Sequence, residues 1–167
     1  MNGDQAKPRL IRSPARLVIA IVLCLAAGNI GTLVIDTGPG SWYDQLVKPD
    51  FTPSGEVIGL IWTVLFILMG IGLYLVWMEG TRTREAGTAM AVFGVQFALN
   101  ILWTLLFFGL HSPFFGLAEI LVLLLAILIT IASFLRVRPA AAALLLPYIL
   151  WTAFAAFLNY RIYVLNP

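Results

Sequence analysis

Charged side chains are scarce in this sequence. Only 11% of the 167 residues are Asp, Glu, Lys or Arg and 61% are hydrophobic, whereas soluble domains average about 25% charged and about 45–50% apolar residues. The length suits a single domain, and a domain of that size could not bury so much apolar surface away from water. The composition therefore excludes an ordinary soluble domain and indicates an integral membrane protein that folds in the lipid bilayer.

Cysteine and histidine each occur once, as Cys24 and His111. A single cysteine excludes an internal disulfide and a cysteine-based zinc site, and no histidine lies inside an apolar segment to serve as an axial haem ligand. We find no paired catalytic carboxylates, nucleophile and base, glycine-rich phosphate loop or metal cluster, so we expect no metal and no required cofactor. The net charge of +2 is scattered, and nucleic acid is therefore not an expected partner.

The apolar residues gather in five long segments. Each is long enough to cross about 30 Å of hydrocarbon as a helix, and the predicted spans are residues 17–35, 57–78, 86–110, 113–135 and 139–163. His111, Ser112 and Pro113 separate the third and fourth spans and predict a tight turn, with the proline at the start of the next helix. We therefore expect an all-α membrane protein with one domain, residues 17–165, formed by a bundle of five transmembrane helices.

Residues 1–16 form a basic tail before the first span. With five spans, the side that holds the amino terminus carries eight Lys and Arg residues, and the opposite side carries two, Lys48 and Arg161. The positive-inside rule then predicts a multi-pass protein of the cell membrane with a cytoplasmic amino terminus. A cleaved signal peptide is the alternative interpretation of the first segment, but the apolar run to Ile35 is longer than a typical signal core.

The connection 36–56 is the longest loop and is rich in aromatic residues. It contains Trp42, Tyr43 and Phe51 together with three prolines and four acidic residues. We interpret this loop as a structured lid over the helix ends. The alternative for Trp42 and Tyr43 is the aromatic belt that membrane proteins place at the bilayer surface.

Polar and aromatic side chains recur at helical spacing inside three spans. Polar groups in hydrocarbon need partners, so they normally face the bundle interior or a cavity. At about 100° per residue, one stripe forms on each of three helices: Trp62, Phe66 and Met69 in the second; Gln96, Asn100, Trp103 and Phe107 in the third; Tyr148, Trp151, Ala155 and Asn159 in the fifth. Three converging stripes predict a pocket, although helix packing would account for any one residue taken alone.

The third span also has a face of small residues, directed about 180° away from its polar stripe. The residues are Gly87, Ala91, Gly94 and Ala98. Small residues at this spacing allow close helix contact in membranes, and we expect them to form a homodimer interface. The alternative is that the groove receives the first helix of the same chain through Gly28 and Gly31.

Glu119 lies about two turns inside the fourth predicted span, whereas the other charged residue within the predicted spans, Arg161, lies at the end of the fifth. A carboxylate inside a membrane is a functional candidate by default. The alternative is a structural role, because Glu119 lies near enough to one end of its helix to be hydrated or hydrogen-bonded there.

Taken in order, these motifs resemble the translocator protein family, whose members are also called tryptophan-rich sensory proteins (TspO) or peripheral benzodiazepine receptors. The resemblance covers residues 17–163. It is carried by Trp42-Tyr43, Leu46, Lys48-Pro49, Phe51 and Pro53 in the first loop, Trp62-Thr63 in the second helix, Gln96, Asn100, Trp103-Thr104 and Phe107-Phe108 in the third, and Pro147-Tyr148, Trp151, Phe154-Ala155 and Leu158-Asn159-Tyr160 in the fifth.

The resemblance implies a five-helix bundle, often dimeric, whose first loop closes a pocket for porphyrins and other flat apolar ligands. The expected ligand is protoporphyrin IX or a haem-type tetrapyrrole, because a broad aromatic plate with carboxylates suits apolar walls that carry a few polar groups. With the stripes included, the expected ligand-binding residues are Trp42, Tyr43, Trp62, Phe66, Gln96, Asn100, Trp103, Phe107, Tyr148, Trp151, Ala155 and Asn159.

The chain departs from the family pattern in two places. Phe51 stands where many members have tryptophan. The sterol motif of animal members requires a short spacer between a tyrosine and a basic residue, but Arg161 directly follows Tyr160. Cholesterol is therefore not favoured as a ligand.

Three classes of function follow from the resemblance. The first is a receptor or carrier for tetrapyrroles. The second is enzymatic, since some members are credited with a light-dependent, oxygen-consuming breakdown of protoporphyrin, for which Trp62 and Trp151 would be the redox-active residues. The third is a structural partner of other membrane proteins.

Overall fold

The computed structural model describes residues 13–80 and 83–167. Within these ranges the chain is helical without β-strands, and five segments are long and apolar enough to cross a bilayer: Pro14–Val34, Gly55–Met78, Arg84–Gly109, Pro113–Val137 and Pro139–Leu165. The predicted all-α, five-span fold is confirmed. Most of the predicted basic tail, residues 1–12, and Arg82 lie outside the described residues.

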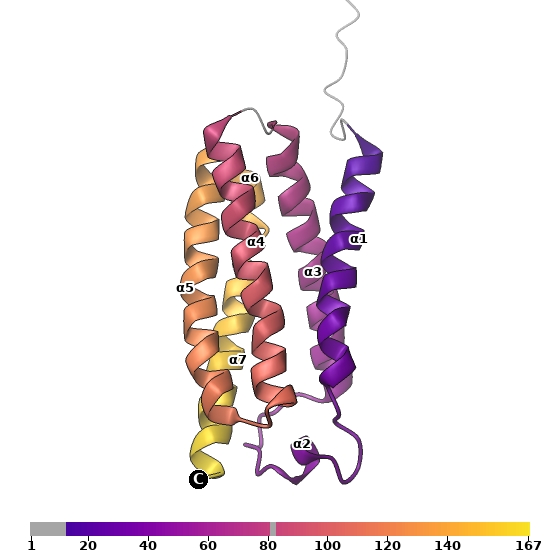
Figure 1. Cartoon of the computed structure of the whole chain (residues 1–167), viewed down its shortest axis with the longest axis vertical. Helices are drawn as coiled ribbons and strands as arrows, with labels where there is room; N and C mark the ends of the chain where they lie inside the picture. The colour runs from indigo at the N-terminus through magenta and orange to yellow at the C-terminus, as the bar shows by residue number, and fades with distance from the viewer. Residues whose placement is uncertain (1–12, 81–82) are drawn as a thin grey trace, which may run out of the picture.

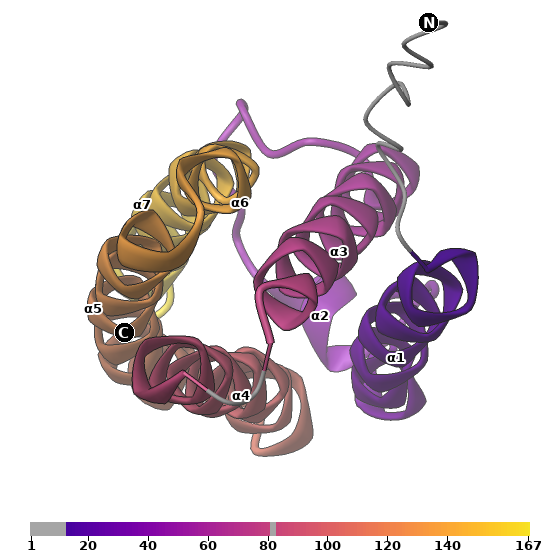
Figure 2. The same ribbon diagram turned by 90° about the horizontal axis from the view of Figure 1, so that it is seen from above.

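The five spans lie side by side along the long axis of the molecule (Figure 1). Seen along that axis, they follow one another around the bundle in the order first, second, fifth, fourth and third (Figure 2). Their elements are α1 (Pro14–Ile30) with a 3-10 turn (Gly31–Val34), α3 (Gly55–Met78), α4 (Arg84–Thr104) with a π-helical turn (Leu105–Gly109), α5 (Pro113–Val137), and the pair α6 (Pro139–Ala143) and α7 (Leu146–Leu165).

The helices begin where the sequence provides capping groups. Thr83 and Ser112 each accept a hydrogen bond from the backbone N–H three residues later, which satisfies a free donor at the start of α4 and of α5. Pro113 is the first residue of α5, and His111 has a φ of 51° just before it. The tight turn predicted at residues 111–113 is thus confirmed.

The fifth span is interrupted. α6 ends at Ala143, and α7 begins at Leu146 with Pro147 in its first turn. Because proline has no N–H to donate, it suits the start of a helix and interrupts a longer one. The interruption precedes Tyr148, the first residue of the stripe predicted for this span.

The lipid-facing surface is apolar, as a bilayer requires. Large aliphatic side chains on the outer faces are more than half exposed, including Leu60, Leu125 and Leu150. Inside the bundle, α1 approaches α3 so closely that a Cβ at Gly70 would lie 2.6 Å from the Ile21 Cα. Small residues therefore permit the close contact that stabilises helices in lipid.

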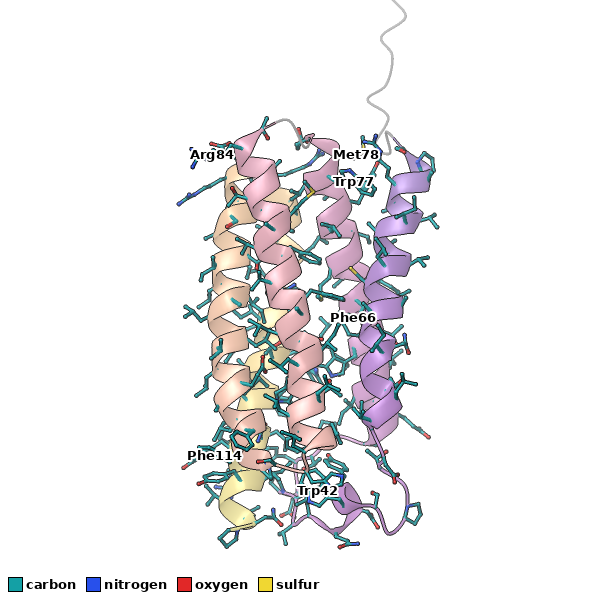
Figure 3. The ribbon with its side chains drawn as sticks, viewed as in Figure 1. Trp42, Phe66, Trp77, Met78, Arg84 and Phe114 are labelled. Atoms are coloured by element: carbon teal, nitrogen blue, oxygen red, sulfur yellow. The ribbon has the colours of Figure 1, made fainter. Side chains whose placement is uncertain are left out.

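The two ends of the bundle differ in charge. The basic end holds Arg16, Arg84, Arg136 and Arg138. Arg138 forms an ion pair with Glu79 at 2.6 Å, and the Arg16 guanidinium lies 5.3 Å from the centre of the Trp77 ring. The opposite end, which we call the loop end, carries residues 36–56 with the short helix α2 (Trp42–Gln45). Figure 3 shows Arg84 and Trp77 at the basic end and Trp42 at the loop end.

Candidate ligand-binding pocket

A cavity of about 800 Å³ lies in the half of the bundle nearest the loop end. Its walls come from α1, α3, α4 and α7, and the loop 36–56 contributes further residues. Nine of the twelve predicted ligand-binding residues line it: Tyr43, Trp62, Phe66, Asn100, Trp103, Phe107, Trp151, Ala155 and Asn159. The three predicted stripes therefore meet at one cavity.

Three predicted residues do not line the cavity. Gln96 and Tyr148 are fully buried in the bundle, and Trp42 packs edge-on against Phe107 with ring centres 5.5 Å apart. Trp42 also stacks on His111 at 4.9 Å. Gln96 and Tyr148 share stripes with lining residues but lie outside the lining, because a stripe fixes the direction of a side chain around its helix but not how far along the helix the cavity extends. Trp42 was predicted from the loop motif, and it packs beside the lining residue Phe107.

Aromatic rings form most of the apolar wall. Trp62 stacks on Phe66 with ring centres 5.6 Å apart, and Trp103 stacks on Phe107 at 5.3 Å. Trp151 lies 5.2 Å from Phe154 on the α7 side. The cavity thus has large flat surfaces on three helices, which suits a flat ligand.

The polar groups of the wall connect helices to one another. Asn100 Nδ2 donates to the Tyr148 hydroxyl at 3.2 Å, which joins α4 to α7. Asn159 accepts from Trp103 Nε1 at 3.3 Å and donates to the Pro113 carbonyl at 2.8 Å. Buried polar groups in lipid need such partners. Trp151 Nε1 differs, because it is buried and has no acceptor among the described residues.

The loop 36–56 packs onto the helices through its aromatic residues. Tyr43 lies 5.4 Å from Phe108, and burial raises the pKa of its phenol. Phe51 is 46% exposed and stacks on Phe157, on the outer side of α7, with ring centres 5.6 Å apart. The packing of Trp42 and Tyr43 against the π-helical turn after α4 argues against a simple aromatic belt for these two residues.

The first span supplies part of the wall that the sequence analysis missed. Gly28, Asn29, Thr32 and Ile35 all line the cavity. Asn29 and Thr32 are polar residues three positions apart, which is a helical spacing, but two residues are too few to define a stripe. Leu158 and Ile162 of α7 were also missed, because apolar residues in an apolar helix carry no signal of direction.

Glu119 is buried but does not line the cavity. Neither of its carboxyl oxygens has a hydrogen-bond partner among the described residues, and the same holds for the side-chain nitrogen and oxygen of Gln96. The described residues therefore provide no hydrogen bond of the kind that the structural alternative for Glu119 supposed. Within residues 13–80 and 83–167, no three His, Cys, Asp or Glu side chains gather to hold a metal ion.

The small-residue face of α4 points out of the bundle. Ala91, Gly94 and Ala98 are exposed, and a Cβ at Gly87 or Gly94 would meet no described atom within 4 Å. The glycines of the first span face elsewhere in the bundle, Gly28 toward Phe66 and Gly31 toward Thr104. The alternative that this groove receives the first helix is therefore wrong.

Fold and cavity together define an integral membrane protein with five spans and an aromatic pocket between its helices. Residues 20–165 match the TspO/MBR family, and the chain belongs to this family. It is similar to the tryptophan-rich protein TspO of Chlorobaculum tepidum, with 40% identity over 90% of this chain and 96% of that one. It is also similar to the human translocator protein (38% identity, 73% of each chain) and to the tryptophan-rich sensory protein of Cereibacter sphaeroides (33% identity, 87% and 88%).

Membership of this family supports a receptor-type or carrier-type role in a membrane. It also agrees with the resemblance stated from the sequence motifs.

Proposed function

We propose that this protein is a membrane receptor or carrier that binds tetrapyrroles of the protoporphyrin type, and related flat amphipathic ligands, between α3, α4 and α7. The observation that carries the proposal is the cavity of about 800 Å³ with tryptophan on three of its sides. Pockets of this size hold ligands of drug to cofactor size. A tetrapyrrole would place its faces against the aromatic rings.

The charge distribution of the wall supports one orientation of such a ligand. Of the residues that line the cavity, only Asp44 and Lys48 carry a full charge, and both belong to the loop. The helical walls that carry Trp62, Trp103 and Trp151 are uncharged and rich in aromatic rings. We propose that the ring system lies against these tryptophans with its carboxylates toward the loop end, and that the loop 36–56 acts as a lid.

The decisive experiment is a titration of the purified protein with protoporphyrin, followed by the absorbance and fluorescence of the porphyrin itself. Trp62→Ala and Trp151→Ala should each weaken binding about fivefold, since an aromatic contact contributes roughly 1 kcal/mol. Trp77→Ala is the matched control, because Trp77 lies at the basic end beside Arg16 and outside the cavity. Equal affinities for all four proteins would contradict the proposed pocket.

An enzymatic function is the second candidate, and one observation favours it. Trp62 and Trp151, the two residues that the light-dependent reaction would use, both line the cavity. Illumination of bound protoporphyrin in air and without oxygen should then yield a porphyrin product over many turnovers, and only in air. Oxidation of the protein without turnover would leave binding as the function. Absence of any porphyrin binding would favour a structural role with other membrane proteins.

We further propose a homodimer in the cell membrane, formed through Gly87, Ala91, Gly94 and Ala98. We also propose that the basic end of the bundle lies in the cytoplasm. Cys24 is the single cysteine of the sequence and is buried. Its replacement by alanine gives a cysteine-free background, in which single introduced cysteines report the orientation. A membrane-impermeant thiol reagent added to intact cells should label Gln45→Cys at the loop end and spare Glu85→Cys at the basic end. The reverse pattern would invert the orientation.

A further inference from the structure

The loop 36–56 is attached to one side of the bundle. Three of its attachments involve the π-helical turn after α4 with the connection to α5, the outer side of α7, and the residue after the end of α7. The pairs are Trp42 with Phe107 and His111, Phe51 with Phe157, and Val47 with Asn166. The first two attachments are ring contacts between apolar or weakly polar side chains. The third is a pair of hydrogen bonds, and it involves a residue that no motif had singled out.

Asn166 follows the last residue of α7, and its side chain forms hydrogen bonds with both the N–H and the carbonyl of Val47. Its Oδ1 accepts from the Val47 N–H at 2.9 Å, and its Nδ2 donates to the Val47 carbonyl at 3.0 Å. The same Nδ2 donates to the Ile162 carbonyl at 2.8 Å. A bond to Ile162 alone would be enough to cap the helix. The two bonds to Val47 are additional, and they join segments 119 residues apart.

The residues beside Val47 lead directly to the cavity. Leu46 packs against the buried cluster of Phe107, Leu158 and Ile162. Lys48 folds back so that its Nζ donates to the Tyr43 carbonyl at 2.6 Å and lies 4.7 Å from the centre of the Tyr43 ring. Tyr43 and Lys48 both line the cavity. Val47 is thus next to Lys48 in the chain, and Lys48 in turn contacts Tyr43.

We infer that Asn166 is a positioning residue for the ligand pocket: by holding Val47 it keeps Tyr43 and Lys48 over the cavity and slows the departure of a bound ligand. The inference rests on the proposed function for its ligand. Asn166 itself does not line the cavity, so it acts only through the loop.

The first test measures the dissociation rate of protoporphyrin. Asn166→Ala should raise the rate about tenfold, the effect expected from losing a pair of ordinary hydrogen bonds. Asn166→Asp should give an intermediate rate, because it keeps an acceptor for the Val47 N–H and loses the donor. Ser133→Ala is the matched control, since it removes a side-chain bond to the carbonyl four residues earlier on α5, and it should leave the rate unchanged.

A double-mutant comparison separates positioning from general stability. In a background that carries both Tyr43→Ala and Lys48→Ala, Asn166→Ala should change the dissociation rate by less than about twofold, because both residues through which it acts are already gone. A full tenfold effect in that background, or a lowered melting temperature that accounts for the faster release, would overturn the inference.

The second test needs no ligand. Hydrogen exchange of the amides at residues 43–48 should be faster in Asn166→Ala than in the parent, while exchange in α4 stays the same. Unchanged exchange at Val47 would overturn the inference whatever the porphyrin data show. If the parent protein binds no protoporphyrin, the proposed function fails, and the exchange data alone decide whether Asn166 holds the loop.

Discussion

The basic end and the loop end of the bundle pack in different ways. Toward the basic end, α3 touches its neighbours closely: a Cβ at Gly70 would lie 2.6 Å from the Ile21 Cα, and one at Gly72 would lie 3.3 Å from the Ala141 carbonyl oxygen. Toward the loop end the same helices enclose about 800 Å³. The hydrogen bonds that join α4 to α7 involve Asn100 and Trp103, which line that cavity.

The difference suggests a division of roles within one bundle. In lipid, helix association depends on close van der Waals contact and on hydrogen bonds between helices. In the half nearest the basic end, α3 makes close contacts with α1 and α6, and the Arg138–Glu79 ion pair adds a side-chain bond. In the half nearest the loop end, two hydrogen bonds join α4 to α7 beside the cavity, and the aromatic surfaces of the cavity remain free to contact a ligand. Substitutions in the two halves should therefore have separable effects on stability and on binding.

The largest effect is expected from a pair of glycine substitutions on α3. Gly70→Val would push a side chain into the α1 backbone and should lower the free energy of unfolding by about 3 kcal/mol. Gly59→Val should have little effect on stability, because a Cβ at Gly59 would meet no described atom within 4 Å. It should weaken porphyrin binding, since Gly59 lines the cavity. Thermal unfolding and porphyrin titration of both variants would show whether the two halves are separable.

Asn100 tests the hydrogen bonds of the loop half. Asn100→Leu should weaken porphyrin binding by roughly 1 to 2 kcal/mol and lower stability by less, because Asn100 lines the cavity. Tyr148→Phe removes the same bond from the buried side and should lower stability with a smaller effect on binding. If the two variants rank the other way, the bond serves packing alone.

Glu119 should show the cost of an unpaired carboxyl group inside the bundle. Both of its oxygens are buried without a partner among the described residues, and a buried polar group without a hydrogen bond costs about 1 to 3 kcal/mol. Glu119→Leu should therefore raise the melting temperature and leave porphyrin affinity unchanged. Lost binding in this variant would instead mark Glu119 as functional.

The smallest effect on the single chain is expected at the outer face of α4. Gly94→Leu combined with Ala98→Leu should yield a monomer in detergent, measured by light scattering, which binds porphyrin as the parent does. Both residues are exposed and on the far side of α4 from the stripe that lines the cavity. A variant that stays dimeric, or that loses folding and binding together, would exclude this face as the interface.

The membrane spans and the direction of several pocket side chains could be predicted from local sequence patterns. Five apolar segments and the proline at position 113 define the spans, because a bilayer selects helices by length and composition alone. Helical spacing correctly directed Trp62, Asn100 and Trp151 toward one cavity.

Only the tertiary structure decided which residues of a stripe line the cavity and which residues the loop 36–56 contacts. Tyr148 shares a stripe with Trp151 yet is buried and does not line the cavity, because the extent of the cavity depends on how far neighbouring helices stand apart. Asn166 holds Val47 across 119 residues, and no local pattern encodes a contact at that separation. The sequence by itself determined which face of each helix carries the polar and aromatic side chains. The packing of the helices against one another determined what those faces enclose.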